Sequence, residues 1–272
     1  MSVVAFAVIH GMGAQNATFA DAFLRAVRTR VEARGIPRNA LEVTSIWWGD
    51  LFQVDEDDLW RRMTQAHRLD WGWLRKFVMG VLADAVAYRR PNPGQYDHYQ
   101  AIHERVYERL AELSVRTSPT TPLVVAAHSL GSVIFSDHVW DEQRRRGPGR
   151  DPLTRCQTLA GLITFGSNIP LFTLGLEQVK PIAFPSPGSA LSAPVRAAAR
   201  WMNYFDPDDV LGYPLREISS AYAATVHEDV SLGVGPLLSG WTPLSHTAYW
   251  NDADFVDRVA GQVATVAKAA SE

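Results

Sequence analysis

The sequence predicts an α/β protein with a mostly parallel central sheet that is covered by helices on both faces. Strand-like and helix-like stretches alternate along the chain, which is the pattern of strand–helix–strand units. Some of the strand-like stretches, such as 3–9 and 123–126, are continuously apolar, as in strands that are buried on both faces. The chain has 272 residues, of which 47% are hydrophobic, and α/β folds of this size often form one unit. We therefore expect residues 1–272 to form a single domain.

The first half of the chain carries two expected strands and two expected helices. Residues 3–9 are apolar and predict a buried strand; with no basic residue before them and no small-x-small pattern after them, they do not resemble a signal peptide. Residues 18–34 place apolar side chains on one helical stripe and stop at Gly35. Residues 41–48 are rich in β-forming side chains, and residues 100–113 return to helical spacing.

The second half repeats the alternation. The predicted strands are 122–127, 159–165, 200–205 and 223–232, and the predicted helices are 132 to about 145 and 254–267.

Two stretches do not fit this alternation. Residues 51–97 contain Trp60, Trp71 and Trp73 at mostly helical spacing, and we interpret them as a helical cap insertion over a site or as extra helices on the sheet. As a cap, this apolar insertion is compatible with peripheral membrane contact. Residues 169–195 are rich in Pro, Gly and Ser; they either line a pocket at a strand end or form a long surface loop.

Composition and absent motifs narrow the classes of function. The net charge of −3 with no basic face argues against nucleic acid as a partner. The single Cys156 excludes an intrachain disulfide framework and suits a reducing, cytoplasmic location. No apolar run reaches ~18 residues, so no transmembrane segment is expected. The zinc, phosphate-loop and dinucleotide motifs are missing, and we expect no metal and no cofactor.

The segment Ala127-His128-Ser129-Leu130-Gly131 has the pattern of a nucleophile elbow. It lies between a buried strand and a helix, where the turn is so tight that only small residues fit two positions before and after the serine. Gly is the usual residue at both positions, and Ala127 adds one methyl group. The elbow predicts Ser129 as a nucleophile whose hydroxyl projects above the sheet; Cys156 lacks such a context and is a weak rival.

A serine hydroxyl needs a base to take its proton and an acid to orient that base. In elbow folds the chain order is Ser, acid, His. His227 and His246 follow a plausible acid. His227 lies in a strand-like run and is interpreted as structural, whereas His246 lies in a loop before the last helix, where the base belongs.

Three carboxylates follow the strand that ends at residue 205: Asp206, Asp208 and Asp209. We favour Asp209, because the apolar tract 210–215 that follows it could bury the carboxylate. Asp206 is the alternative, because it is nearest to the strand end. The remaining aspartates are expected to form a turn beside Pro207.

The oxyanion formed in acyl transfer needs two aimed N–H donors. We expect one from the amide of Leu130 and the other from Met12, with Gly11 or Gly13 as alternatives to Met12. The residues expected to contact the substrate are His10, Gly11, Gly13 and His128.

Taken together, these motifs resemble the α/β-hydrolase superfamily, in particular its lipase- and esterase-like members. The resemblance rests on residues 10–13, 127–131, 203–210 and 245–250, and so extends over most of the chain. The Asp209-Val210 segment also resembles phospholipase-like relatives, which supports Asp209 as the acid. The departures are Ala127 and the absence of Pro after Asp209.

The resemblance implies a serine hydrolase that cleaves a carboxylic ester, or a related acyl bond such as a thioester, an amide or a phospholipid ester. Ser129, His246 and Asp209 would act through an acyl-enzyme, and the substrate would be a small acyl ester or a lipid. Two other functions stay open at this point. One is a catalytically degenerate hydrolase-fold protein that binds a partner or a lipid surface, and the other is a cofactor-free lyase or perhydrolase that uses the same three residues.

Overall fold

The protein forms a six-stranded parallel sheet with the strand order β2-β1-β3-β4-β5-β6. The computed structural model describes residues 4–12, 15–51, 53–66, 70, 72, 75, 78, 88, 97–147, 150–235 and 245–272. The strands are β1 Val4–Ile9, β2 Leu41–Ile46, β3 Leu123–His128, β4 Leu159–Phe165, β5 Arg200–Phe205 and β6 Glu228–Ser231. The predicted α/β class with a parallel sheet is confirmed.

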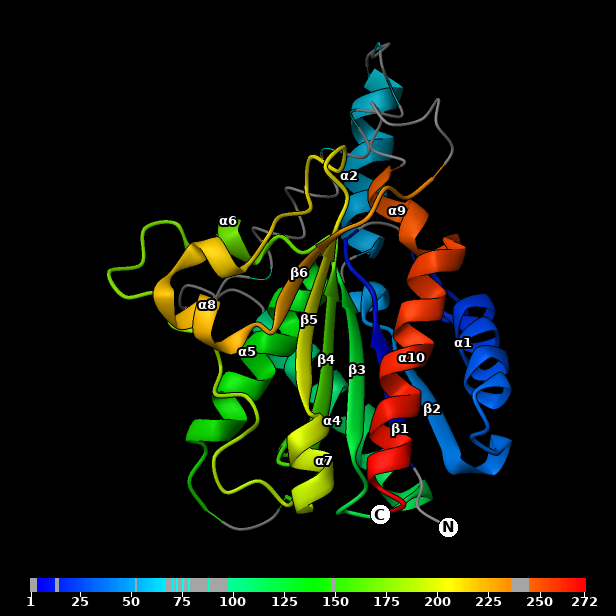
Figure 1. The fold of residues 1–272 in the computed structure, drawn as a ribbon. Coiled ribbons are helices and arrows are strands. Elements are labelled where there is room, and N and C mark those ends of the chain that lie inside the picture. Colours follow the sequence, from blue (N-terminus) through cyan, green and yellow to red (C-terminus); the bar gives the residue numbers. More distant parts are fainter. Residues whose placement is uncertain are drawn as a thin grey trace.

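The strand order reverses at β1, which pairs with β2 on one side and with β3 on the other. All strands point the same way, so their carboxyl ends meet at one edge of the sheet, at the top of Figure 1. In open parallel sheets, ligands bind beyond this edge at the point where the order reverses. Here that point lies between the ends of β1 and β3.

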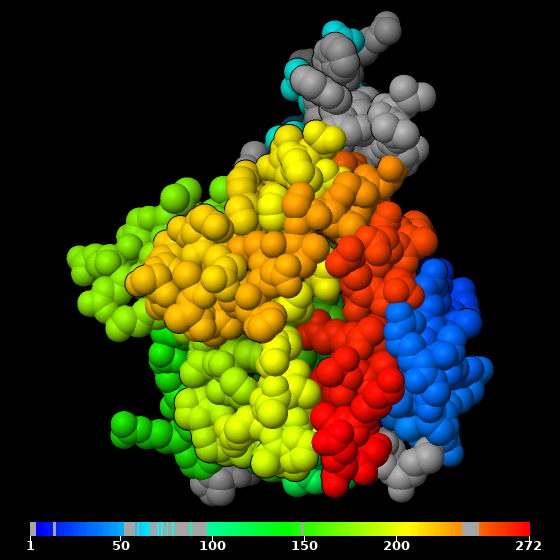
Figure 2. Space-filling model, viewed as in Figure 1, coloured from blue at the N-terminus to red at the C-terminus, as the bar shows by residue number. Residues whose placement is uncertain are grey.

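Helices cover both faces of the sheet (Figure 1). The α-helices of the described residues are α1 Asp21–Ala33, α2 Gln53–Ala66, α4 His98–Arg116, α5 Leu130–Arg144, α6 Ile169–Thr173, α7 Ala193–Ala198, α8 Ser220–Thr225, α9 Ser245–Ala248 and α10 Ala253–Ala269. One core cluster joins the sheet to α1, α7 and α10, and a second joins it to α4, α5 and α8. In the space-filling view, α10 (red) lies beside α1 (blue), and the two helices close one face (Figure 2).

Side chains that cap helices determine where two of the helices begin, and the apolar periodicity of the sequence alone places these starts wrongly. The helix expected from residue 100 begins at His98, because the Asp97 side chain accepts a hydrogen bond from the Gln100 amide. The helix expected from residue 18 begins only at Asp21, after a turn in which the Asn16 side chain accepts from the amide of Thr18.

The strand predicted over 223–232 is partly wrong. Residues 220–225 form α8, and only Glu228–Ser231 pair with β5. The Ala-rich stretch Ala221–Ala224 favours a helix, and the Ser219 side chain caps it by accepting from the amide of Tyr222.

The two irregular stretches are described to different extents. Within the expected cap 51–97, α2 is helical and Tyr88 is buried, whereas Trp71 and Trp73 lie outside the described residues. Residues 169–195 start with α6 and end in α7, with an irregular segment between them. None of the helices in the described part of the chain is long and apolar enough to cross a membrane.

Candidate functional site

The chain reverses sharply at Ser129, between β3 and α5. Ser129 has φ 51° and ψ −127°, a left-handed conformation that is costly for a residue with a Cβ atom. A Cβ on Gly131 would lie 2.4 Å from the His10 carbonyl oxygen, and one on Gly11 would lie 2.3 Å from Ser129 Cβ. The two glycines therefore allow the end of β1 to approach the turn that follows β3. Ala127 fits within the buried core, so the additional methyl group is accommodated.

Buried hydrogen bonds hold the strained turn. The hydroxyl of Ser132 donates to the Ser129 carbonyl at 2.5 Å, and its oxygen lies 2.7 Å from Ser167 Oγ. The Ser129 amide donates to the carbonyl of Phe165 at 3.0 Å. Leu130 is the first residue of α5, so its amide is one of those that have no acceptor within the helix.

His246 lies next to Ser129, although 117 residues separate them. Its Nε2 accepts from Ser129 Oγ at 2.7 Å, and its Nδ1 lies 2.9 Å from both carboxylate oxygens of Asp209. The residue was predicted in a loop; it lies instead in the short helix α9, before the last helix. The structure thus brings Ser129, His246 and Asp209 into one hydrogen-bonded chain.

Asp209 has no exposed side-chain surface. Burial by itself raises the pKa of this carboxyl, but the hydrogen bond and charge of His246, with the amide of Leu211, outweigh burial and lower the pKa below its ordinary value. The hydroxyl of Tyr249 donates to Asp209 Oδ2 at 3.1 Å. The carboxylate is therefore held ionised and oriented by three donors.

The tract 210–215 covers Asp209 as expected, but not through its first residue, because Val210 is 69% exposed. Gly212, within the tract, lies against the carboxylate: a Cβ on it would be 2.5 Å from Asp209 Oδ2. Gly166, which follows β4 and has φ +52°, adds a second cover, since a Cβ on it would be 3.1 Å from the same oxygen. Only residues without a side chain leave room for the carboxylate here.

The other two aspartates have different partners. Asp206 Oδ1 accepts from the amide of Asp208 at 2.8 Å, which forms the expected turn, and Asp206 Oδ2 accepts from the amide of Val234 at 2.7 Å. Asp208 is exposed. The contacts described for the alternative acid, Asp206, are thus with backbone groups rather than with His246.

His10 is buried and bonded through both ring nitrogens. Its Nδ1 donates to the Gly11 carbonyl at 2.7 Å, and its Nε2 accepts from the amide of Trp48 at 3.1 Å. Burial lowers the pKa of His10 to about 4, against the smaller opposing effects of the Gly11 hydrogen bond and Asp50. The neutral ring therefore fixes the turn after β1 through backbone contacts, and its predicted contact with substrate stays a prediction.

His128 is also buried and bonded to protein. Its Nε2 donates to the carbonyl oxygen of His246 at 2.7 Å. Burial, followed by the nearby charge of His246, lowers the pKa of His128 to about 3. The described contacts of His128 thus position the backbone of α9, and its predicted substrate contact is likewise untested.

The remaining predicted site residues lie around the turn after β1. Met12 is half-buried against the α4–α5 side of the core, Gly11 touches Ser129, and Gly13 lies outside the described residues. His227 is exposed, consistent with its exclusion as the base, and burial raises the pKa of the Cys156 thiol. Donation to an oxyanion by Met12 and Leu130 stays a prediction.

Sequence reasoning assigned no role to Tyr249. Its hydroxyl bridges the site by donating to Asp209 and accepting from the amide of Asp206 at 2.7 Å. Burial, then the charge of Asp209, raises the pKa of Tyr249, so the phenol keeps its proton. An available signal was its position three residues after His246, which puts both side chains on one side of a helical turn.

Comparison of the chain with family models, curated proteins and solved structures found no match. Among the described residues, no group of three or more His, Cys, Asp or Glu side chains is arranged to hold a metal ion. The function is therefore inferred from the geometry of the site itself.

Proposed function

We propose that the protein is a serine hydrolase of the α/β-hydrolase type that cleaves a carboxylic ester or a related acyl bond. The observation that carries the proposal is the hydrogen-bonded chain from Ser129 Oγ through His246 to Asp209. Its position supports the same conclusion, because the strained turn lies where the strand order reverses. As part of the same proposal, we interpret residues 51–97 as a helical cap over the site.

In the proposed reaction, protons move along this hydrogen-bonded chain. Ser129 Oγ attacks the acyl carbonyl carbon while its proton moves to His246 Nε2. The Asp209 carboxylate keeps the other imidazole proton on Nδ1 and stabilises the imidazolium. The amides of Leu130 and Met12 would donate to the oxyanion. When the tetrahedral intermediate collapses, the bond to the alcohol breaks and His246 protonates the leaving oxygen. A water molecule, deprotonated by His246, then releases the acid and restores the Ser129 hydroxyl.

Burial affects how this site works. The Ser129 side chain has no exposed surface, and His246 is 5% exposed. Excluding water strengthens each of the hydrogen bonds in the chain. It also means that groups covering Ser129 must move before a substrate can reach the hydroxyl.

The test compares Ser129→Ala with Ser114→Ala, a matched change at a buried serine in α4. We expect Ser129→Ala to lower kcat for p-nitrophenyl acetate by about 10⁴-fold or to the background rate, and to abolish labelling by a fluorophosphonate probe. Ser114→Ala should retain both activities.

The outcome separates the alternatives. Hydrolysis at the wild-type rate by the Ser129→Ala protein would contradict the proposal. A wild-type protein that neither hydrolyses esters nor reacts with the probe after prolonged incubation would favour the degenerate, binding-only protein. Product analysis on the active protein distinguishes hydrolysis from lyase or perhydrolase chemistry.

A further inference from the structure

A groove of about 400 Å³ runs between α5, α6 and α8. Its most buried lining residues are apolar or aromatic: Val133, Ile169, Ile182 and Tyr222. Its exposed lining includes Gln178 and Lys180. An apolar floor with a few polar groups, at this volume, is typical of sites for small organic ligands.

Ser129 does not itself line the groove, but one wall of the groove starts one helical turn away from it. Val133 lies one helical turn after Ser129 in α5, and helical side chains lean toward the start of their helix. Ile169, on the opposite wall, donates its amide to Ser167 Oγ, which is hydrogen-bonded to Ser132 Oγ. Ser132 in turn bonds the Ser129 carbonyl. A chain of three hydrogen bonds, of 3.4, 2.7 and 2.5 Å, thus connects Ile169 on the groove wall to the elbow.

The groove and His246 lie on different sides of the sheet. The floor residues belong to the core cluster of α4, α5 and α8, whereas Tyr249, just after α9, belongs to the cluster of α1 and α10. In Figure 1, α6 and α8 lie to the left and α9 to the right. The leaving alcohol has to meet His246 Nε2, because that atom protonates it. The part of the substrate that extends away from His246 is then the acyl part.

We propose that this groove binds the acyl chain of the substrate, and that the protein prefers esters of medium or long apolar acids. The inference rests on the proposed function, because it takes Ser129 as the point of acyl attachment. The rim of the groove supports an apolar occupant: Leu176 lines the groove and is 58% exposed. A bound chain would cover this leucine and the apolar floor, which is favourable in proportion to the apolar area removed from water.

The first test narrows the groove. Thr173 lines it, and its hydroxyl donates back to the Pro170 carbonyl; Thr265, exposed on α10, donates in the same way to the carbonyl of Gly261. We expect Thr173→Phe to lower the ratio of kcat/KM for p-nitrophenyl decanoate to that for p-nitrophenyl acetate by at least about tenfold, the effect of excluding one or two methylenes. Thr265→Phe should leave the ratio unchanged.

A second pair of variants covers the case in which Thr173→Phe does not fold. Leu176→Asp puts a charge on the exposed rim, and Leu174→Asp makes the same change at a 77% exposed leucine that does not line the groove. Leu176→Asp should lower the decanoate-to-acetate ratio, and Leu174→Asp should not. Equal ratios in both members of each pair would overturn the proposal. The proposal would also be overturned if the variants changed kcat/KM according to the alcohol in a series of acetate esters, and not according to the length of the acyl chain.

A binding measurement keeps this inference separate from the proposed function. In the Ser129→Ala protein, a dansylated undecanoic acid should bind, and Thr173→Phe should weaken that binding at least about fivefold. If Thr173→Phe weakens probe binding but the protein shows no Ser129-dependent hydrolysis, the groove would be supported as a binding site for acyl chains. The proposed hydrolase function would then be rejected. Absence of probe binding to the Ser129→Ala protein would reject the groove even if the hydrolase activity is found.

Discussion

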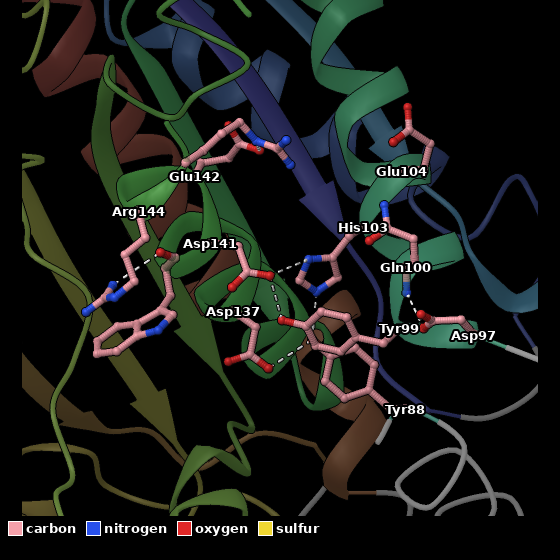
Figure 3. Close-up of polar contacts among 12 residues, drawn as sticks. Tyr88, Asp97, Tyr99, Gln100, His103, Glu104, Asp137, Asp141, Glu142 and Arg144 are labelled. Carbon is pink, nitrogen blue, oxygen red and sulfur yellow. Dashed lines mark hydrogen bonds and ion pairs between the residues drawn. The ribbon is translucent and has the colours of Figure 1, made fainter. Parts of the chain in front are cut away.

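The molecule contains two clusters in which a buried histidine lies beside carboxylate and tyrosine side chains. The first, which we call the strand-end cluster, consists of Ser129, Asp209, His246 and Tyr249. The second, the helix cluster, lies between α4 and α5 and consists of Tyr88, Tyr99, His103, Asp137 and Asp141 (Figure 3). Both combine a buried histidine with carboxylates and tyrosine.

The difference lies in what the histidine touches. In the strand-end cluster, His246 Nε2 meets a serine hydroxyl at 2.7 Å. In the helix cluster, His103 Nε2 meets the phenol of Tyr88 at 3.0 Å, and its ring stacks on that of Tyr99 at 4.0 Å. The Tyr88 phenol, between His103 and Asp137, links separate segments of the chain. Ser129 instead places its hydroxyl at a strained turn beside His246, where the proposed reaction needs a nucleophile. A buried histidine with a carboxylate is therefore not by itself a reaction site.

The largest expected contrast concerns the two carboxylates. Asp209→Asn should lower kcat for p-nitrophenyl acetate by about 10⁴-fold, because the amide stabilises the wrong tautomer of the imidazole. Asp141→Asn changes the acceptor for the Tyr99 hydroxyl at 3.0 Å. We expect kcat to stay within about twofold of wild type, because a polar substitution near the surface and away from the proposed site has a small effect. Steady-state kinetics on both proteins make the comparison.

The alternative acid provides the control for this contrast. Asp206→Asn weakens acceptors for the amides of Asp208 and Val234 and should lower the free energy of unfolding by about 1–3 kcal/mol with activity retained. If Asp206→Asn abolished activity while Asp209→Asn did not, the assignment of Asp209 as the acid would be wrong.

An intermediate contrast concerns the two tyrosines. Tyr249→Phe removes a donor to the ionised Asp209 and should lower kcat about tenfold, as expected for a hydrogen bond to a charged group worth about 1.5–3 kcal/mol. Tyr88→Phe removes the bond to Asp137 at 2.9 Å and the contact with His103, and should lower stability by about 1–2 kcal/mol without changing the acetate rate. Urea unfolding and initial rates, measured on the same preparations, separate the two roles; the reverse assignment of effects would contradict the comparison.

A last contrast concerns the pH dependence of stability, to which a buried histidine next to each cluster contributes. His138, whose ring is 5.7 Å from that of His103, and His128 in the strand-end region both have a pKa lowered to about 3, mainly by burial. Between pH 6.5 and 3, each of these two histidines binds a proton in the unfolded chain but not in the folded chain. Each histidine therefore makes the protein less stable as the pH falls, by about 2 kcal/mol between pH 7 and 5.

His138→Leu tests this dependence without touching the strand-end cluster. We expect the loss of stability between pH 7 and 5 to be about 2 kcal/mol smaller in this variant than in the wild type, as measured by urea unfolding at both pH values. An unchanged pH slope would contradict this, because it would mean that His138 binds its proton equally well in the folded and unfolded chains.

The sequence located much of the framework, because the relevant signals are local. The strands 159–165 and 200–205 have the predicted bounds, since each is a short β-rich run between turns. Chain order around a tight turn predicts that Ser129, His246 and Asp209 meet, and their side chains are hydrogen-bonded to one another. The helix α8 was missed because β-forming and helix-forming residues are mixed in a short stretch, and pairing with β5 decides between them.

Other features could not be predicted, because they depend on distant segments meeting. The cover over Asp209 includes Gly166, which follows β4 and is far from Asp209 in the chain. The groove takes its walls from α5, α6 and α8 and from the segment around Ile182. Its apolar side chains look in the sequence like ordinary core residues, and only the packing of these elements leaves a space between them.

The distance along the chain between Ser129 and His246 has a consequence for folding. Their hydrogen bond spans 117 residues, and the bond from His128 to the His246 carbonyl spans 118. Contacts of such long range form slowly, because the entropy of closing the loop is lost before they stabilise the chain. During synthesis, the sheet from β1 to β5 can therefore assemble before the proposed base leaves the ribosome. The nascent protein would carry a formed elbow without a partner for its hydroxyl, and ester hydrolysis should be among the last properties to return on refolding.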